Sequence, residues 1–149
     1  IRITNDAEQN LRANPADGAN VVDKPLVFAA TDANTGKDPN VAASAYTNNV
    51  AGAKVTTLYN IDHTLDVLLT QVPPNDGVLN TVGSLGVKTT ANAGFDIISR
   101  KEQNVGIAAL QLEGERGSRL YTIDLTTGAV TLIGKIGGNK VVTGITASF

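Results

Sequence analysis

Leu58-Tyr59-Asn60-Ile61-Asp62 and Leu120-Tyr121-Thr122-Ile123-Asp124 are two copies of one phrase, and this repeat decides the fold. A Val/Ile-Gly-x-Leu/Ile-Gly phrase follows each copy, at residues 82–86 and 133–137. A weaker third copy runs from Asn10 to Asn14, with Gly18 in the turn that follows. A phrase that recurs in one order at intervals of tens of residues indicates one supersecondary unit repeated along the chain. We therefore expect a fold made of stacked units.

The composition favours β-structure. The 149 residues suit a single domain, in which folding buries about two-thirds of the surface of the open chain. Three Tyr, three Phe and no Trp leave an interior made mostly of Val, Leu, Ile and Ala. Fifteen Gly, with many Asn, Asp and Thr between short apolar runs, are typical of strands joined by tight turns. No window carries the helical apolar period with caps, so we expect little helix.

Thirteen strand-sized runs can be recognised by alternation or by β-branched residues, at 1–4, 9–13, 19–22, 25–30, 40–47, 55–61, 66–72, 78–82, 94–99, 105–111, 119–124, 129–133 and 141–147. The runs between 94 and 133 make one complete unit, an antiparallel sheet of four strands that matches a propeller blade in size. The chain then holds roughly three blades, fewer than the four to eight with which propellers close. The predicted fold is all-β, with antiparallel four-stranded sheets repeated as blades of a partial propeller.

Residues 1–149 are expected to form one β-repeat domain, the C-terminal part of a longer propeller-like domain. The sequence has no Met, and Ile1 to Thr4 alternate as the middle of a strand does. An open stack of blades exposes sheet edges, which recruit other chains. We therefore expect another copy of the chain, or its missing N-terminal part, to cover the exposed blade.

Charge and cysteine content exclude several classes of function. The net charge is -2, and residues of both signs are interspersed, so no positive field attracts nucleic acid or an anionic membrane. No apolar run approaches the roughly 20 residues that span a bilayer. The absence of Cys excludes disulfides, thiolate metal sites and cysteine nucleophiles. We expect no nucleic-acid partner and no membrane insertion.

Six ordered motifs cover nearly the whole chain. They are Gln9-Asn10-Leu11-Arg12-x-Asn14-Pro15, Ala45-Tyr46-Thr47-Asn48-Asn49, Thr57-Leu58-Tyr59-x-Ile61-Asp62, Pro73-Pro74-Asn75-x-Gly77-x-Leu79, Gly94-Phe95-Asp96-Ile97 and Leu120-Tyr121-Thr122-Ile123-x-x-x-x-Gly128. With them the chain resembles a bacterial family catalogued as domain of unknown function 4394. The resemblance implies an exported, propeller-like repeat protein, extracellular or periplasmic, usually longer on the N-terminal side. It brings no catalytic residues.

The segment from Asp32 to Asp38 is a candidate metal site. Asp32, Asn34 and Asp38 space oxygen side chains as D-x-N-x-G-x-D, which resembles loops in which alternate oxygens converge on calcium. The bidentate Glu of a full loop does not follow, and Lys37 would repel the ion. The alternative is a turn in which Asp and Asn bond their own backbone. Calcium is the one cofactor that the sequence suggests, and the turn is the simpler interpretation.

The sequence favours structural roles for the other residues that could take part in catalysis or binding. His63 is the only histidine, and without a nucleophile motif or a partner set it is interpreted as a turn residue. Asp62 and Asp124 occupy equivalent repeat positions, so we expect them to accept backbone N–H groups in the following turn rather than to form a glycosidase pair. Tyr59 and Tyr121 recur likewise and are expected to pack between sheets.

The leading hypothesis is a non-enzymatic, extracytoplasmic β-repeat protein that serves as a scaffold or binding surface, because no catalytic residues converge. The main rival is a propeller-type, metal-dependent hydrolase. Its ligands would come from several blades, with Asp32, Asp38, Asp96 and Asn104 as the residues to inspect. A third possibility is an extracellular assembly or filament subunit that stacks through open sheet edges.

Overall fold

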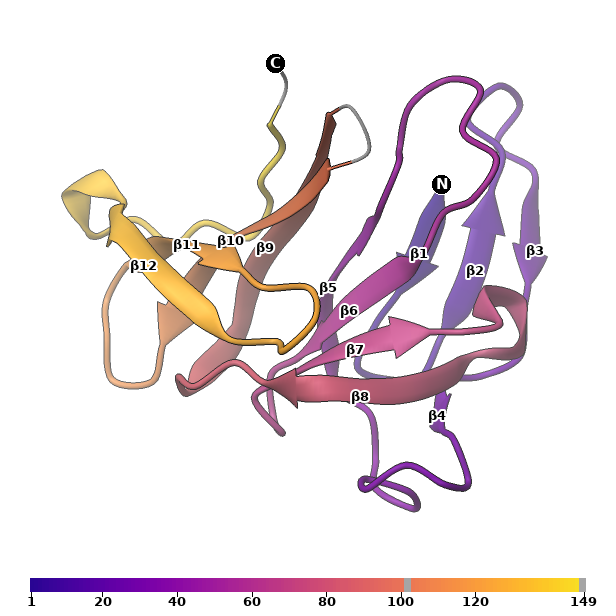
Figure 1. Cartoon of the computed structure of the whole chain (residues 1–149), viewed down its shortest axis with the longest axis horizontal. Helices are drawn as coiled ribbons and strands as arrows, with labels where there is room; N and C mark the ends of the chain where they lie inside the picture. Colours follow the sequence, from indigo (N-terminus) through magenta and orange to yellow (C-terminus); the bar gives the residue numbers. More distant parts are fainter. Residues whose placement is uncertain (101–102, 148–149) are drawn as a thin grey trace.

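The fold consists of three β-sheets in a computed structural model that describes residues 1–100 and 103–147 (Figure 1). The first sheet contains β1 (Arg2–Thr4), β2 (Asn10–Ala13) and β3 (Asn20–Val22). The second contains β4 (Val27–Phe28), β5 (Val41–Tyr46), β6 (Leu58–Asp62), β7 (Val67–Gln71) and β8 (Val78–Ser84), in the order β4-β8-β7-β6-β5. The third contains β9 (Thr89–Arg100), β10 (Gln103–Leu112), β11 (Ser118–Ile123) and β12 (Val130–Lys135), in the order β12-β11-β10-β9.

The prediction of an all-β fold with antiparallel sheets is confirmed. Two short 3₁₀ helices, Pro74–Asp76 and Gly137–Asn139, are the helical segments of the described residues. Within those residues, no helix has the length and apolar character needed to cross a membrane. Neighbouring strands pair antiparallel, apart from β4, which pairs parallel with β8. Little helix forms because the apolar periods along the chain are those of strands.

Three details of the prediction are wrong. The sheets have three, five and four strands, so only the third has the predicted count. The run at 25–30 contributes only the two residues of β4, and the run at 141–147 forms no strand. That last segment instead crosses a face of the third sheet, where Gly144 lies against Gly94 and Ala147 N donates to Asp96 Oδ2. A segment on the face of a sheet meets side chains and cannot join its hydrogen-bond ladder.

The sequence repeat corresponds to a structural repeat. Each copy is the middle strand of an antiparallel meander, namely β1-β2-β3, β5-β6-β7 and β10-β11-β12. The first and third copies end in the same turn, because Gly18 N bonds Asn14 O at 2.9 Å and Gly128 N bonds Asp124 O at 2.8 Å. Both glycines have a positive φ, 74° and 82°, which only glycine adopts without steric cost.

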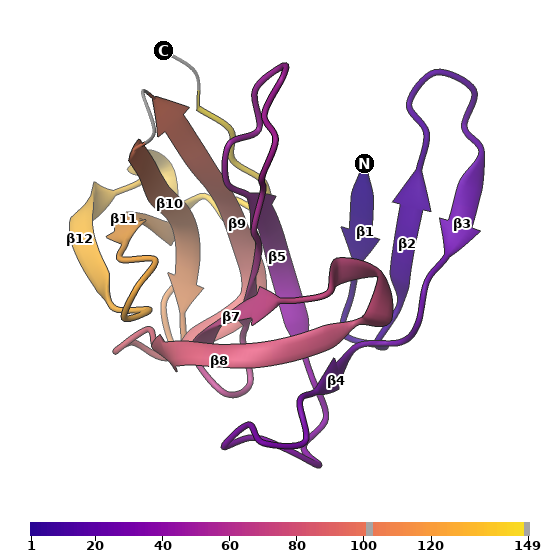
Figure 2. The ribbon, with the colours of Figure 1, turned by 45° about the vertical axis from the view of Figure 1, so that its right-hand side comes forward.

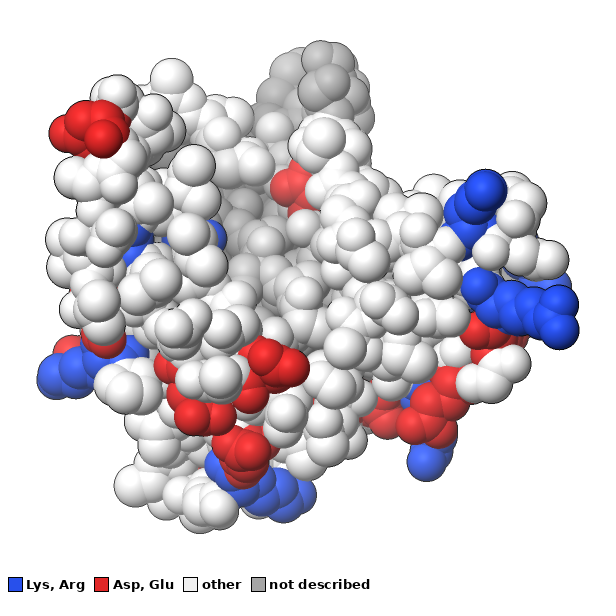
Figure 3. Space-filling model, turned by 180° about the vertical axis from the view of Figure 1, so that it is seen from behind, with Lys and Arg blue, Asp and Glu red and all other residues white. Residues whose placement is uncertain are grey.

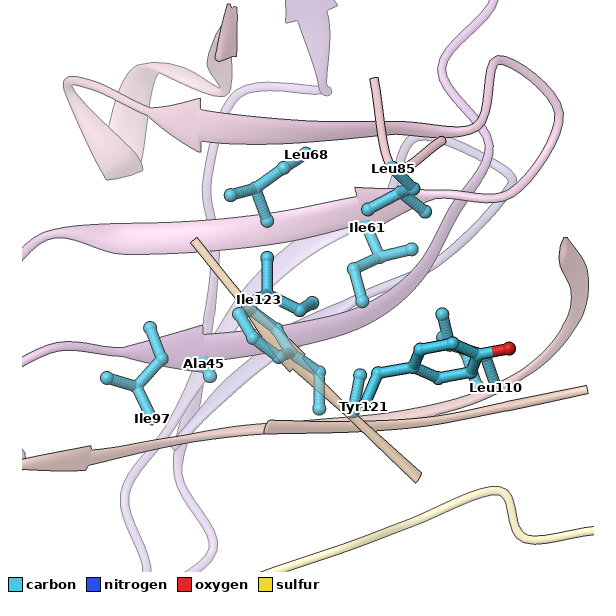
Figure 4. Packing of buried hydrophobic residues seen from close by; sticks show 11 residues of the cluster. Ala45, Ile61, Leu68, Leu85, Ile97, Leu110, Tyr121 and Ile123 are labelled. Carbon is cyan, nitrogen blue, oxygen red and sulfur yellow. The ribbon is translucent and has the colours of Figure 1, made fainter. Parts of the chain in front are cut away.

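The main hydrophobic core lies between the second and third sheets (Figure 4). The repeat supplies Ile61 from β6 together with Tyr121 and Ile123 from β11, all buried. The rest of this core comes from the facing strands and the β8–β9 connection: Ala45, Leu68, Leu85, Ala93, Phe95, Ile97, Ala108 and Leu110. A smaller core covers the opposite face of the second sheet and contains Leu26, Phe28, Val41, Val67, Leu69 and Leu79.

Equivalent faces of the repeat meet at both sheet interfaces. Ile61 and Ile123 hold the same repeat position, and both point into the core between the second and third sheets. Asn60, one residue earlier, points the other way, toward the first sheet, which stands beside β5 (Figure 2). Arg12 is its counterpart in the first sheet and lies on the face that meets the second sheet. The first interface is consequently polar and the second apolar.

Candidate functional site

A buried chain of polar side chains joins the first sheet to the second. Thr4 Oγ1 lies 2.7 Å from Ser44 Oγ, and Ser44 donates to Asn60 Oδ1 at 2.6 Å. Asn60 Nδ2 donates to Gln71 Oε1 at 3.0 Å, and Gln71 Nε2 donates to Asn10 Oδ1 at 3.2 Å. No buried side-chain nitrogen or oxygen of the described residues lacks a partner. A fully satisfied network of this kind specifies one geometry between the two sheets.

Two arginines of the first sheet extend this network around one carboxylate. Arg2 Nη1 donates to Asp23 Oδ2 at 2.6 Å and to Asn10 Oδ1 at 2.7 Å. Arg12 forms a bidentate pair with Asp23 through Nε and Nη2, at 2.8 and 2.9 Å. The pKa of Asp23 lies below its ordinary value because Arg12, and then Arg2, stabilise the charged form against the opposing effect of burial. Arg2, Arg12 and Asp23 together carry one net positive charge.

A cavity of about 530 Å³ opens beside these arginines. Arg2 and Arg12 line it together with Tyr46 of β5, and its other walls are mainly aliphatic: Ile1, Ala13, Ala19 and Val21, with Asn14 at the side. Arg2 Nε reaches the Tyr46 hydroxyl at 3.4 Å. The volume falls within the usual range of small-molecule sites, and the mixture of apolar walls with a few polar groups is typical of them.

Sequence reasoning missed this cavity, although two of its features are visible in the sequence. Arg2 and Arg12 each stand between two apolar neighbours in a strand, and Asn10 and Gln71 each have one apolar neighbour. A polar residue on the buried face of a strand signals a buried network. The packing of the first sheet against a face of the second cannot be read from one sequence, and that packing brings the four side chains together.

The structure brings Asp32 and Asn34 together around Thr81 of β8. Asp32 Oδ2 accepts from Thr81 N at 2.6 Å, and Asp32 Oδ1 accepts from Thr81 Oγ1 and from Asn34 N, both at 2.8 Å. Burial, the largest influence, raises the pKa of this carboxyl, but the three hydrogen bonds together hold it below its ordinary value. Lys37 Nζ donates to Asn34 Oδ1 at 2.8 Å. These bonds favour the turn interpretation, and the calcium loop stays a prediction.

Asp38, the third member of that segment, faces Glu8 instead. A hydrogen bond with Asp38 raises the pKa of Glu8, and burial and repulsion by Asp38 and Asp6 act in the same direction. Across residues 1–100 and 103–147, no group of three or more His, Asp or Glu side chains is arranged to hold a metal ion.

On the face seen in Figure 3, acidic and basic side chains are interspersed toward the lower part and the sides.

Asp96 and Asn104, the other residues suggested for a metal on the propeller axis, have separate partners. Asp96 Oδ2 accepts from Thr146 Oγ1 and Ala147 N at 3.2 and 3.0 Å, which fixes the C-terminal segment. Asn104 Oδ1 accepts from Ser99 Oγ at 2.6 Å and Asn48 N at 3.2 Å. Both side chains act in structural hydrogen bonds and lie apart from Asp32 and Asp38 in their bonding.

The repeat aspartates have the predicted turn role. Asp62 Oδ1 accepts from the N–H groups of Thr64 and Leu65, each at 2.9 Å, and Asp124 Oδ1 accepts from Thr126 N at 2.8 Å. Asn14, their counterpart in the first copy, accepts from the N–H two residues on at 3.0 Å. The repeated acceptor thus receives a backbone N–H from two residues further on in all three turns.

The repeat tyrosines and the histidine also follow the structural interpretation. Tyr121 is buried in the main core and Tyr59 packs against that core, which confirms their predicted packing role. Burial raises the pKa of both phenols. His63 lies in the turn after β6, where its backbone N–H donates to Asn40 O at 3.1 Å.

The sequence profile of one protein family matches residues 1–146, and the family is described as a domain of unknown function (DUF4394). The chain belongs to this family. Among curated proteins and among solved structures, nothing matches the chain. Membership in the DUF4394 family confirms the resemblance drawn from the ordered motifs, and it assigns no activity.

Proposed function

We propose that this DUF4394 chain is a non-enzymatic, extracytoplasmic β-repeat protein that acts as a scaffold by pairing its first sheet with a second copy. The observation that carries the proposal is an exposed apolar row on the outer face of that sheet. Ile3, Leu11 and Val22 are direct cross-strand neighbours on this face. The exposed fractions of Ile3 and Val22 are 45% and 76%.

The repeat indicates what this face would meet. Leu11 and Ala13 hold the repeat positions that Tyr59 and Ile61 hold in the second sheet, where they pack on the main core. The corresponding face of the third sheet is buried in the same core, so like faces pair there. A second copy offers the identical outer face, and the two would meet across a two-fold axis as an isologous contact. Removal of contiguous apolar surface from water drives such pairing.

Location outside the cytoplasm is carried over from the family resemblance as part of the proposal, and a propeller-like arrangement of blades stays an expectation of that resemblance. A ring generated by rotation brings unlike faces of successive sheets together, whereas like faces meet at both interfaces of this chain. The scaffold proposal therefore rests on sheet pairing and does not require a closed ring. Pairing through a face also differs from filament growth through sheet edges, because a two-fold contact ends with two copies.

Light scattering coupled to size-exclusion chromatography, over a range of concentrations, tests the pairing. We expect a dimer that becomes a monomer when Ile3→Lys and Val22→Lys are combined, with an unchanged melting temperature because both side chains are exposed. Val55→Lys, at an exposed loop position away from the sheet, is the matched control and should remain dimeric. A folded monomer at every concentration would refute the proposal. So would a dimer that the paired lysines leave intact, or masses that grow into filaments.

A further inference from the structure

The arginine-lined cavity beside β1 and β2 points to a ligand, independently of how the sheets pair. Its inner end is rigid because both charged groups behind it are desolvated. The side chains of Arg2 and Asp23 retain only 5% and 6% of their exposure. Arg2 is held by four partners, since its Nη2 also donates to Asn75 Oδ1 at 2.7 Å. Preorganised positive charge of this kind binds an anion with little loss of side-chain entropy.

Charge compensation inside the cavity is incomplete. Two guanidinium groups share the single carboxylate of Asp23, which leaves one positive charge in excess. Arg12 uses Nε and Nη2 for that carboxylate, and among the described residues its Nη1 has no hydrogen-bond partner. Its side chain keeps 47% of its exposure, so this nitrogen can meet a ligand from solvent. The Tyr46 hydroxyl accepts from Arg2 and retains its own proton for donation.

We propose that this cavity binds a small monocarboxylic acid with a compact apolar group. The carboxylate would accept from Arg12 Nη1 and from the Tyr46 hydroxyl and would neutralise the excess charge. Charge-assisted bonds from Arg are among the strongest that a protein forms with a carboxylate. The aliphatic side chains of Ala19 and Val21, on the same face of the first sheet as Arg12, would cover the apolar group. A phosphate or another small inorganic anion would leave these walls in contact with water, so the lining favours an organic acid.

The structural alternative is that both arginines only clamp Asp23 and thereby fix β1 and β2 to the second sheet. This alternative and the ligand hypothesis differ in what they predict for a neutral molecule of the same shape and for the Tyr46 hydroxyl. A clamp has no affinity for a carboxylate in solution, and it does not need the proton on Tyr46.

Binding is tested by titrating the purified chain with benzoate, and separately with benzyl alcohol and inorganic phosphate, while amide shifts are followed by NMR. We expect benzoate to shift residues of β1, β2 and β5, to weaken with added salt, and to bind at least about tenfold more tightly than benzyl alcohol. Arg12→Gln and Tyr46→Phe should each weaken benzoate binding, the first by about tenfold. Arg116→Gln, an exposed arginine in the β10–β11 turn, is the control and should change nothing.

Thermal melting of each variant separates lost binding from lost folding. If Arg12→Gln fails to fold, the Tyr46→Phe variant and the preference for benzoate over its alcohol decide the matter. The proposal is overturned if 10 mM benzoate produces no shifts, if phosphate or the alcohol binds as well, or if the folded variants bind as the native chain does. Since light scattering measures pairing and NMR measures the ligand, failure of either proposal leaves the other intact.

Discussion

Replacement of Gln71 by Leu tests whether the polar chain between the first two sheets stabilises the fold. Gln71 is fully buried, and its amide bonds Asn60, Asn10 and Pro74. Leu has nearly the same volume, so no large cavity forms. The Pro74 carbonyl keeps its bond from Asn10 Nδ2 at 2.9 Å, and Asn10 Oδ1 keeps its bond from Arg2. Only Asn60 Nδ2 loses its acceptor, and a buried unsatisfied amide costs about 1–3 kcal/mol of unfolding free energy.

Urea unfolding followed by circular dichroism measures this loss, since the chain has no Trp to report by fluorescence. In the Gln71→Leu variant, the further substitution Asn60→Leu removes the unsatisfied amide. Asn60→Leu should therefore lower the unfolding free energy by at least about 0.5 kcal/mol less in that variant than it does in the native chain. Thr70→Val, a near-isosteric change on the preceding residue of β7, should stay within about 0.5 kcal/mol. A Gln71→Leu variant as stable as the native chain would show that these hydrogen bonds contribute no stability, and the reasoning would be refuted.

Four further outcomes follow from the packing and the charges. Gly83→Ala places its Cβ 2.1 Å from a backbone oxygen of the β11–β12 turn and should destabilise by about 1–3 kcal/mol or more in urea, while Gly134→Ala, with no atom within 4 Å, is the control. Ile61→Ala should cost about 2–5 kcal/mol because it empties the main core, and equal loss from exposed Ile133→Ala would contradict this. The pKa of Asp32 in the folded chain is lowered from 3.8, so the stability that its charged form contributes is complete above pH 3.8 and is lost as the pH falls through the folded pKa. The unfolding free energies of the native chain and of Asp32→Asn should therefore converge in acid. Calcium should not raise the melting temperature of the native chain, and a rise that Asp32→Asn abolishes would establish the calcium loop.

Local patterns predicted most of the strands. The repeated Leu-Tyr-x-Ile-Asp phrase correctly placed β6 and β11, and the third copy placed β2, because alternation fixes which residues share a face. The turn roles of Asp62 and Asp124 were also predictable, since an Asx turn is a contact between residues two or three apart. Residues 141–147 resemble a strand in sequence, yet they form no strand and lie across Gly94 on a face of the third sheet.

Contacts between the sheets could not be predicted from the sequence alone. The bond from Gln71 to Asn10 joins residues 61 positions apart, and no local period indicates it. Asp32 and Asp38 appeared as one oxygen-rich segment, but β8 draws Asp32 to Thr81 while Asp38 meets Glu8. The cavity beside Arg12 depends on the same long-range placement, since Tyr46 comes from a different sheet.

Because equivalent faces of the sheets pair with one another, the number of sheets in a chain decides whether every apolar face is covered. When the apolar faces of sheets associate only in matched couples, an odd number of sheets always leaves one such face unmatched, and in a chain with three sheets this surplus is the outer face of the first sheet. Duplication of a single meander would remove the surplus by making the number even, whereas duplication of two would preserve it. Growth of the domain by one unit or by two would therefore alternate between self-sufficient and partner-dependent molecules.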